Sequence, residues 1–203
     1  KRSEFIGHIK RVSTVEEARA YIESVRKTYH DARHVCSAFV IGADRDVQRS
    51  SDDGEPAGTA GVPMMQALLA RQTREDGTTD LSDVVAVVVR YFGGIKLGAG
   101  GLVRAYTDAV VQTLDGALFD SRERLRVGEV PSSHAEAGRL ENEMRAAGLN
   151  VLGTEYGAEG AVISVGVFDR AEELSRAEEL VVSLSSGAAS VTWGDTQWVD
   201  LPV

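Results

Sequence analysis

The stretch from residue 84 to residue 106 constrains the fold of this chain more than any other part. It opens with six consecutive apolar residues at 84–89, of which five are valine. A short β-branched run of this kind is typical of a strand that is covered on both faces. Five glycines follow within residues 91–101, and a helical pattern of apolar residues begins at Leu102. The sequence therefore predicts a central strand, a glycine-rich loop and a helix packed against the sheet.

The residues before this stretch predict a layered N-terminal domain. Two overlapping capping boxes, Ser13 with Glu16 and Thr14 with Glu17, mark the start of a helix. Pro63 is a favourable first-turn residue and starts a second helix. The expected strands lie at 5–12, 34–41 and 84–89. The expected helices lie at 13–29, from 63 onward and at 102–118, and we expect a polar loop at 42–61. Together these elements predict a mixed sheet with helices layered on it.

The pattern after residue 122 predicts a second domain. Polar residues and a change of charge coincide at 120–123, so we divide the chain into domains 1–121 and 122–203. Expected strands lie at 124–130, 151–156, 161–168 and 190–199, and expected helices start at the caps Ser133 and Asp169. The order βαββαβ is that of the ferredoxin-like split motif. The expected fold class is therefore α+β, with a two-layer α/β domain followed by a ferredoxin-like domain.

The composition excludes several classes of protein. Cys36 is the only cysteine, so no intramolecular disulfide can form, which favours the reducing cytoplasm. One cysteine and four scattered histidines show no spacing typical of a metal site, and we expect neither metal nor cofactor. The longest apolar run is far shorter than the roughly 18 residues that a membrane-spanning helix needs. We therefore expect a cytoplasmic protein that does not contact membranes.

The net charge of −9 is unevenly distributed. The first 121 residues carry −2 of it and the remaining residues carry −7. A surface of this sign repels phosphate backbones, which disfavours general nucleic-acid binding. Residues 84–107 are the exception, since they contain Arg90, Lys96 and Arg104 and no acidic residue. Any site for an anion should therefore be local to this segment.

The glycine-rich segment allows a functional and a structural interpretation. Glycines permit positive φ angles, and the unpaired amides at a helix start favour an anion. The segment lacks the Gly-Lys-Ser/Thr ending of a Walker A loop and does not match the G-x-G-x-x-G dinucleotide fingerprint. It is either a cradle for phosphate or carboxylate, or a turn that lets a helix pack on a sheet. The candidate anion-binding residues are Arg90, Gly94, Lys96, Gly98, Gly100, Gly101 and Arg104.

Two further groups of residues could carry chemistry. The acidic segment 51–61 holds Asp52, Asp53 and Glu55, which suit either metal ligation and general-base catalysis or turn formation. We favour the turn, because no third ligand or partner base is visible. Cys36 and His34 lie two residues apart on one strand and face the same side, as a nucleophile and its base could. A single cysteine in a strand is more often a small core residue, and we expect no catalysis there.

Three segments resemble the IMPACT/YigZ family. SDDGEPAGTAG at 51–61 and VVVRYFGGIKLGAGGLVRAY at 87–106 are similar to its signature, and DARHVCSAF at 31–39 resembles its third motif. The third motif often has His-His-Cys-Trp where this chain has His34, Val35, Cys36 and Ser37, which weakens a metal or catalytic role for that strand. The family residues matched here are Asp53, Gly54, Glu55, Pro56, Gly58, Thr59, Gly61, Arg90, Tyr91, Gly93, Gly94, Lys96, Gly98, Gly100, Gly101, Arg104 and Tyr106.

The resemblance covers the whole chain and implies a function in binding. It implies an N-terminal domain with the fold shared by a small-subunit ribosomal protein and the fourth domain of elongation factor G, and a C-terminal domain like that factor's last domain. Eukaryotic IMPACT proteins restrain a stress kinase of translation initiation by competing for its activator protein, without known catalysis. A bacterial relative lacks that pathway, so the role does not transfer directly.

Three hypotheses follow for the function. The first is a non-enzymatic binding protein linked to translation or its regulation, which contacts RNA, the ribosome or a protein partner. The second is an enzyme or sensor that binds a small phosphorylated ligand at the glycine-rich loop. It requires Asp53 or Glu55 to converge on that loop and form a pocket. The third makes both motifs purely structural.

Overall fold

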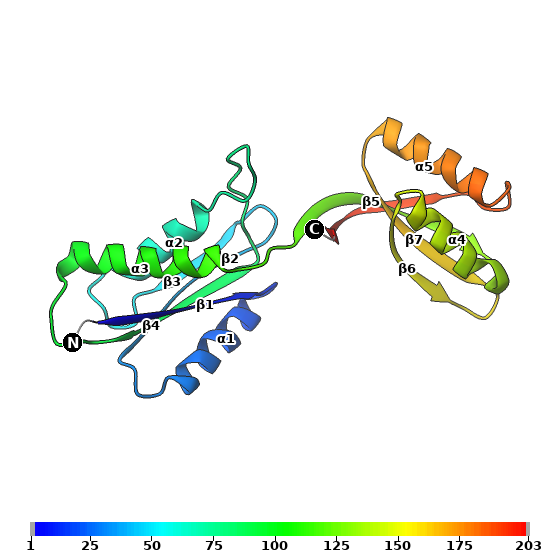
Figure 1. Ribbon diagram of the computed structural model, residues 1–203. Coiled ribbons are helices and arrows are strands. Elements are labelled where there is room, and N and C mark those ends of the chain that lie inside the picture. The colour runs from blue at the N-terminus through cyan, green and yellow to red at the C-terminus, as the bar shows by residue number, and fades with distance from the viewer. Residues whose placement is uncertain (1–2, 202–203) are drawn as a thin grey trace. The chain divides into compact units, whose positions relative to one another are not determined.

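The computed structural model describes residues 3–201, which divide into two compact units between Leu118 and Phe119 (Figure 1). Within the described residues there are two antiparallel sheets and five helices, so the predicted α+β class is confirmed. None of the helices in this range is long and apolar enough to cross a membrane.

The first unit contains a four-stranded sheet of order β1-β4-β2-β3. Its elements are β1 (Glu4–Arg11), α1 (Val15–Thr28), β2 (His34–Ile41), β3 (Val47–Ser51), α2 (Gly61–Leu69), β4 (Val84–Tyr91) and α3 (Gly98–Asp115). All neighbouring strands run antiparallel, so the prediction of a mixed sheet is wrong. The expected polar loop at 42–61 contains β3, which pairs with the edge of β2 through its backbone and needs no apolar pattern.

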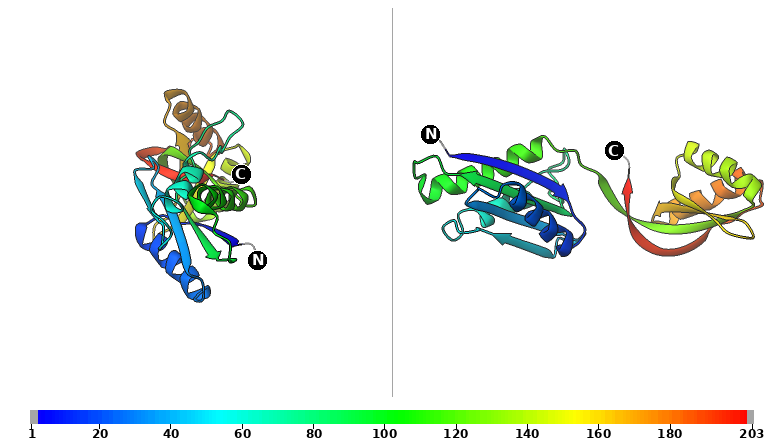
Figure 2. Two further views of the ribbon diagram at one scale, coloured as in Figure 1. Left: turned by 90° about the vertical axis from the view of Figure 1, so that its left-hand side faces the viewer. Right: turned by 90° about the horizontal axis from the view of Figure 1, so that it is seen from below.

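Helices cover both faces of this sheet, so the unit has three layers where two were expected (Figures 1 and 2). The apolar side chains of β2 and β4 alternate between two cores, as Cys36 and Val88 face α2 and α3 while Phe39 and Val87 face α1. The continuously apolar strand β4 requires this cover on both sides. The strand β4 ends at Tyr91, where the glycine-rich segment begins.

The helix α3 lies very close to β1. A Cβ atom at Gly7 of β1 would stand only 2.1 Å from the hydroxyl oxygen of Thr113 and 3.0 Å from the carbonyl oxygen of Ala109, both on α3. Gly7 is therefore required by this close approach.

The second unit has the ferredoxin-like arrangement that the sequence predicts. Its elements are β5 (Ser121–Ser132), α4 (His134–Ala146), β6 (Asn150–Tyr156), β7 (Ala161–Phe168), α5 (Ala171–Leu184) and β8 (Thr192–Leu201), with the antiparallel sheet order β6-β7-β5-β8. Leu140 of α4 and Val181 of α5 pack on Ile163 in the core of this unit. Asp169 does not cap α5 as expected, because its carboxylate forms an ion pair with Arg126 at 2.8 Å.

Candidate functional site

Asp52 holds the start of α2 in place. Its carboxylate accepts hydrogen bonds from the backbone amides of Gly58 at 2.8 Å, Ala60 at 3.0 Å and Gly61 at 2.7 Å. Burial raises the pKa of this carboxyl, but the three amides outweigh burial and leave the pKa below its ordinary value. Two of these amides, those of Ala60 and Gly61, stand at the start of α2, where a helix leaves amides unpaired, so Asp52 acts as a helix cap.

The turn after Asp52 depends on the other residues of the acidic motif. The hydroxyl of Thr59 donates to the carbonyl oxygen of Pro56 at 2.6 Å, and Gly54 and Gly58 have φ angles of +82° and +75°. A Cβ at Gly61 would lie 2.8 Å from the backbone nitrogen of Ser51, so α2 can approach β3 only with glycine there.

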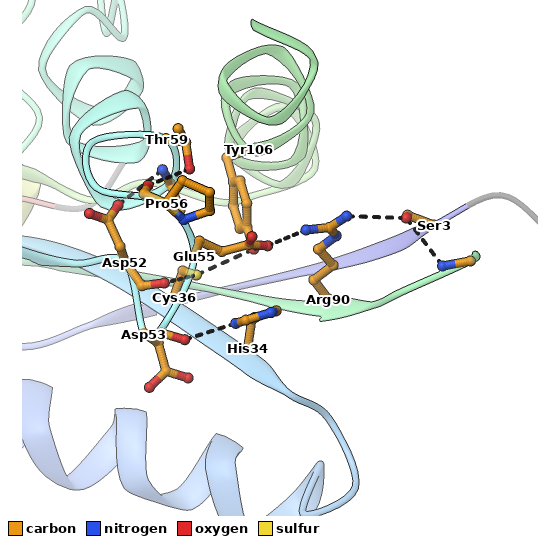
Figure 3. Close-up of polar contacts among 12 residues, drawn as sticks. Ser3, His34, Cys36, Asp52, Asp53, Glu55, Pro56, Thr59, Arg90 and Tyr106 are labelled. Atoms are coloured by element: carbon orange, nitrogen blue, oxygen red, sulfur yellow. Dashed lines mark hydrogen bonds and ion pairs between the residues drawn. The ribbon is translucent and has the colours of Figure 1, made fainter. Parts of the chain in front are cut away.

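Asp53 connects α1 to β2. Its two carboxylate oxygens accept from Arg26 at 3.0 Å each, and one of them also accepts from the backbone amide of Val35 at 2.6 Å. Its carbonyl oxygen lies 2.9 Å from the Nδ1 atom of His34. Burial raises the pKa of the Asp53 carboxyl, but the bonds and charge of Arg26 and the Val35 amide outweigh it and lower the pKa. In Figure 3 this carboxylate points toward α1 and away from Glu55.

Glu55 forms a buried ion pair with Arg90 (Figure 3). One oxygen of Glu55 lies 2.5 Å from the Arg90 Nη1 atom and accepts from the hydroxyl of Tyr106 at 2.8 Å. The side chains of Glu55 and Arg90 are only 4% and 6% exposed. The rings of Phe5 and Phe92 lie 5.5 and 5.6 Å from the Arg90 guanidinium carbon. Arg90 is thus neutralised within the core and is not available to a ligand as a free cation.

Cys36 belongs to the same buried cluster. Its sulfur lies 3.3 Å from the Tyr106 hydroxyl and 3.0 Å from the Asp52 carbonyl oxygen. Burial raises the pKa of the Cys36 thiol to about 12, so the thiol stays protonated at neutral pH. The Nδ1 atom of His34 is engaged by the Asp53 carbonyl oxygen rather than by the Cys36 thiol. Among residues 3–201, no three His, Cys, Asp or Glu side chains are placed to hold a metal ion.

The glycine-rich segment, in contrast, presents exposed side chains. Six exposed side chains between β4 and the second turn of α3 form what we call the loop surface: Phe92, Ile95, Lys96, Leu97, Val103 and Arg104. The four apolar members are 36–64% exposed, with Ile95 the most exposed. Neither Lys96 nor Arg104 has a hydrogen bond or ion pair to the rest of the described chain. The acidic motif therefore neutralises one of the three cations of this segment and leaves two available.

The remaining residues of this segment shape the loop surface. Gly94 and Gly98 have φ angles of +91° and +72°, and the Gly93 amide donates to the Ser3 hydroxyl at 3.2 Å. Gly100 and Gly101 lie in the first turn of α3, which starts four residues earlier than predicted. Tyr91 donates from its hydroxyl to Asp31 at 2.6 Å. The backbone around Gly94, Gly98 and Gly100 is open, with no atom within 4 Å of an added Cβ.

Comparisons with known proteins establish the family of this chain. The family profile of the Impact N-terminal domain matches residues 1–114. The chain belongs to the IMPACT family. It is 36% identical over all its 203 residues to the IMPACT family member YvyE of Bacillus subtilis, covering 88% of that protein. It is 49% identical to the IMPACT family member YigZ of Escherichia coli over 116 residues, which are 56% of this chain and 53% of YigZ.

A solved structure also resembles this IMPACT-family protein. It is described as the crystal structure of an hypothetical protein and is 33% identical in sequence, with a TM-score of 0.60. The similarity covers 94% of this chain and 88% of the other, so it extends over both units.

Sequence reasoning alone missed two features of this IMPACT-family protein. Arg26 was not recognised as the partner of Asp53, because 27 residues separate them and the ion pair exists only once α1 packs on the sheet. The apolar part of the loop surface was also missed, although its signal was present. Phe92, Ile95 and Leu97 lie among glycines, where neither a strand nor a helix gives them a core to face.

Cys36 of this protein should be unreactive in the native state. We expect iodoacetamide at pH 8 to alkylate it roughly 100-fold or more slowly than in urea, because a buried thiol of raised pKa supplies almost no thiolate. Mass spectrometry of timed samples measures both rates. Comparable rates with and without urea would show that Cys36 is accessible and supplies thiolate as an ordinary exposed cysteine does.

Proposed function

We propose that this protein is a non-enzymatic binding protein in translation or its regulation, and that it docks a protein partner on the loop surface. The loop surface carries the proposal, because it combines four exposed apolar side chains with two cations that have no partner in the described chain. Contiguous exposed apolar side chains commonly mark protein interaction sites, and an apolar centre with a polar rim is the usual anatomy of an interface.

The chemistry of the loop surface favours a protein over a nucleic acid. Ile95 and Leu97 are aliphatic and offer no ring on which a base could stack. Two cations can neutralise few phosphates, whereas the whole chain carries −9. The partner that fits has an apolar patch beside acidic side chains, which would face Lys96 and Arg104.

The buried residues support a non-enzymatic role. Asp52 and Asp53 cap and connect secondary structure, while Glu55 and Cys36 lie in the core with Arg90 and Tyr106. The hypothesis of a small-ligand enzyme requires Asp53 or Glu55 to converge on the glycine-rich loop, and neither side chain does so. The family resemblance implies that the first domain shares its fold with translation-factor domains, and this supports a role in translation by analogy of fold.

RNA is a second candidate partner, favoured by one observation. The start of α3 has no side-chain cap and no acidic residue in its first turn, so its amides are available near Lys96. Such amides suit phosphate oxygens. A contact of this kind would weaken steeply as the salt concentration rises, whereas an apolar protein contact would not.

Photocrosslinking in cells tests this proposal. A photoreactive phenylalanine analogue placed at Ile95 should crosslink to a protein, and the same analogue at Lys27 should not. Lys27 is the matched control, since it is an exposed residue of α1 on the opposite face of the sheet. Adding Arg104→Glu should reduce the crosslink at position 95 by roughly tenfold. Equal crosslinking at both positions would contradict the proposal, and a crosslink to RNA would favour the second candidate.

A further inference from the structure

Two helices of the first unit, α1 and α3, begin very differently. The helix α1 starts with a full set of stabilising contacts. The Thr14 hydroxyl accepts from the Glu17 amide at 3.1 Å, and the Glu17 carboxylate accepts from the Ser13 amide at 2.7 Å. Glu16 and Glu17 also place negative charge in its first turn. These contacts satisfy the unpaired amides and complement the helix dipole.

The helix α3 starts without any of these contacts. Its N-cap residue, Leu97, makes no side-chain hydrogen bond, and its first turn has no acidic residue. Three of the four residues at 98–101 are glycine, which loses more conformational freedom on folding than any other residue. A helix start of this composition is stabilised by few contacts. Local opening is expected where backbone hydrogen bonds are exposed and packing is sparse.

We propose that the first turn of α3, residues 98–101, opens in the free protein and becomes ordered when a partner docks on the loop surface. The docking half of this inference rests on the proposed function, and the opening half does not. Leu97 and Val103 bracket the turn and are both exposed apolar members of the loop surface. Their spacing is fixed only when the turn is helical, so a partner that contacts both selects the ordered form.

Hydrogen exchange in the free protein tests the opening. In an α-helix, the amides of Leu102 and Val103 bond to carbonyls of the first turn of α3, as those of Arg19 and Ala20 do in α1. After correction for intrinsic rates, we expect Leu102 and Val103 to exchange roughly tenfold faster than Arg19 and Ala20. Equal protection of the two pairs would overturn the inference.

One substitution tests the cause of the opening. Gly100 has an ordinary helical backbone and open space around an added Cβ, so Gly100→Ala introduces no clash. It should slow the exchange of Leu102 and Val103 about fivefold, because alanine favours the helix over glycine. Gly138→Ala is the matched control, since Gly138 is an exposed glycine of α4 with equally open surroundings. An unchanged exchange rate in Gly100→Ala would show that the glycines do not cause the opening.

The coupling to a partner has its own readout. Gly100→Ala should also increase the yield of the protein crosslink at position 95, because less ordering remains to oppose docking. An unchanged yield, with exchange slowed as expected, would overturn the coupling. Complete absence of a crosslink, with the exchange results as expected, would remove the proposed function and leave the opening established.

Discussion

Replacing Glu55 by alanine should lower the free energy of unfolding of the first unit by about 3–5 kcal/mol. The substitution leaves the guanidinium of Arg90 buried at 6% exposure without its ion-pair partner. It also removes the acceptor of the Tyr106 hydroxyl. No other carboxylate replaces Glu55 among the hydrogen bonds of Arg90 in the described chain, which are to Glu55 and Ser3. An unpaired buried charge is among the most costly defects that a single substitution can create.

Urea unfolding measures this effect, and two further variants interpret it. Glu23→Ala removes an exposed ion pair to Arg26 and should change the stability by about 0.5 kcal/mol or less. The double variant Glu55→Ala with Arg90→Met removes both charges and should recover part of the loss. A loss below about 1 kcal/mol in Glu55→Ala would show that water or another group solvates Arg90 and that the pair is not a core element.

Replacing Gly7 by alanine should cost about 2–3 kcal/mol, because a Cβ there overlaps α3. The Thr113 side chain could rotate away, but it already donates to the Ala109 carbonyl at 2.7 Å. The Ala109 carbonyl itself lies 3.0 Å from the added Cβ and can move only with the helix backbone. The substitution therefore forces α3 away from β1.

Thermal unfolding with a rescue variant checks the origin of this loss. Thr113→Ala added to Gly7→Ala removes the closest contact and should restore part of the stability, with the Ala109 contact remaining. Gly153→Ala is a matched control in a strand, since nothing lies within 4 Å of its added Cβ, and it should be nearly neutral. A Gly7→Ala protein as stable as the unsubstituted one would mean that α3 does not lie as close to β1 as described.

Elements with a strong apolar pattern could be predicted from the sequence. The strand β2 has the predicted bounds, His34–Ile41. Its mostly apolar residues lie between the polar residue His34 and the glycine at 42, and these mark the two ends of the strand. The strand β3 could not be predicted, because its residues Val47–Ser51 are mostly polar and it exists only as a pairing with β2. The start of α3 was missed because glycine favours a loop by propensity, and propensity was the only signal there.

The sequence predicted which motifs form the candidate site, but it did not predict which of their charged residues are buried and which are exposed. The sequence indicated that the acidic and glycine-rich motifs belong together, and Glu55 does contact Arg90. It could not indicate that Arg90 is buried while Lys96 and Arg104 are exposed, although all three lie in one acid-free segment. Burial depends on the face of β4 that Arg90 occupies and on the face of α3 that Arg104 occupies, while Lys96 lies in the loop between these two elements. The glycines of that loop hide how the two elements are aligned.

The approach of α3 to β1 also affects how the sheet meets other molecules. β1 ends the strand order of the first sheet, and such edge strands can recruit a strand from another chain and start aggregation. Two copies joined through β1 would set these strands about 4.8 Å apart, whereas packed helices need about 8–10 Å between their axes. In an antiparallel pairing about a two-fold axis, both copies of α3 would stand on the same face of the joined sheet. Because α3 lies directly against β1 at Gly7, these helices would collide before the strands could pair. The glycine that lets the helix approach thus also protects this edge of the sheet against antiparallel self-association.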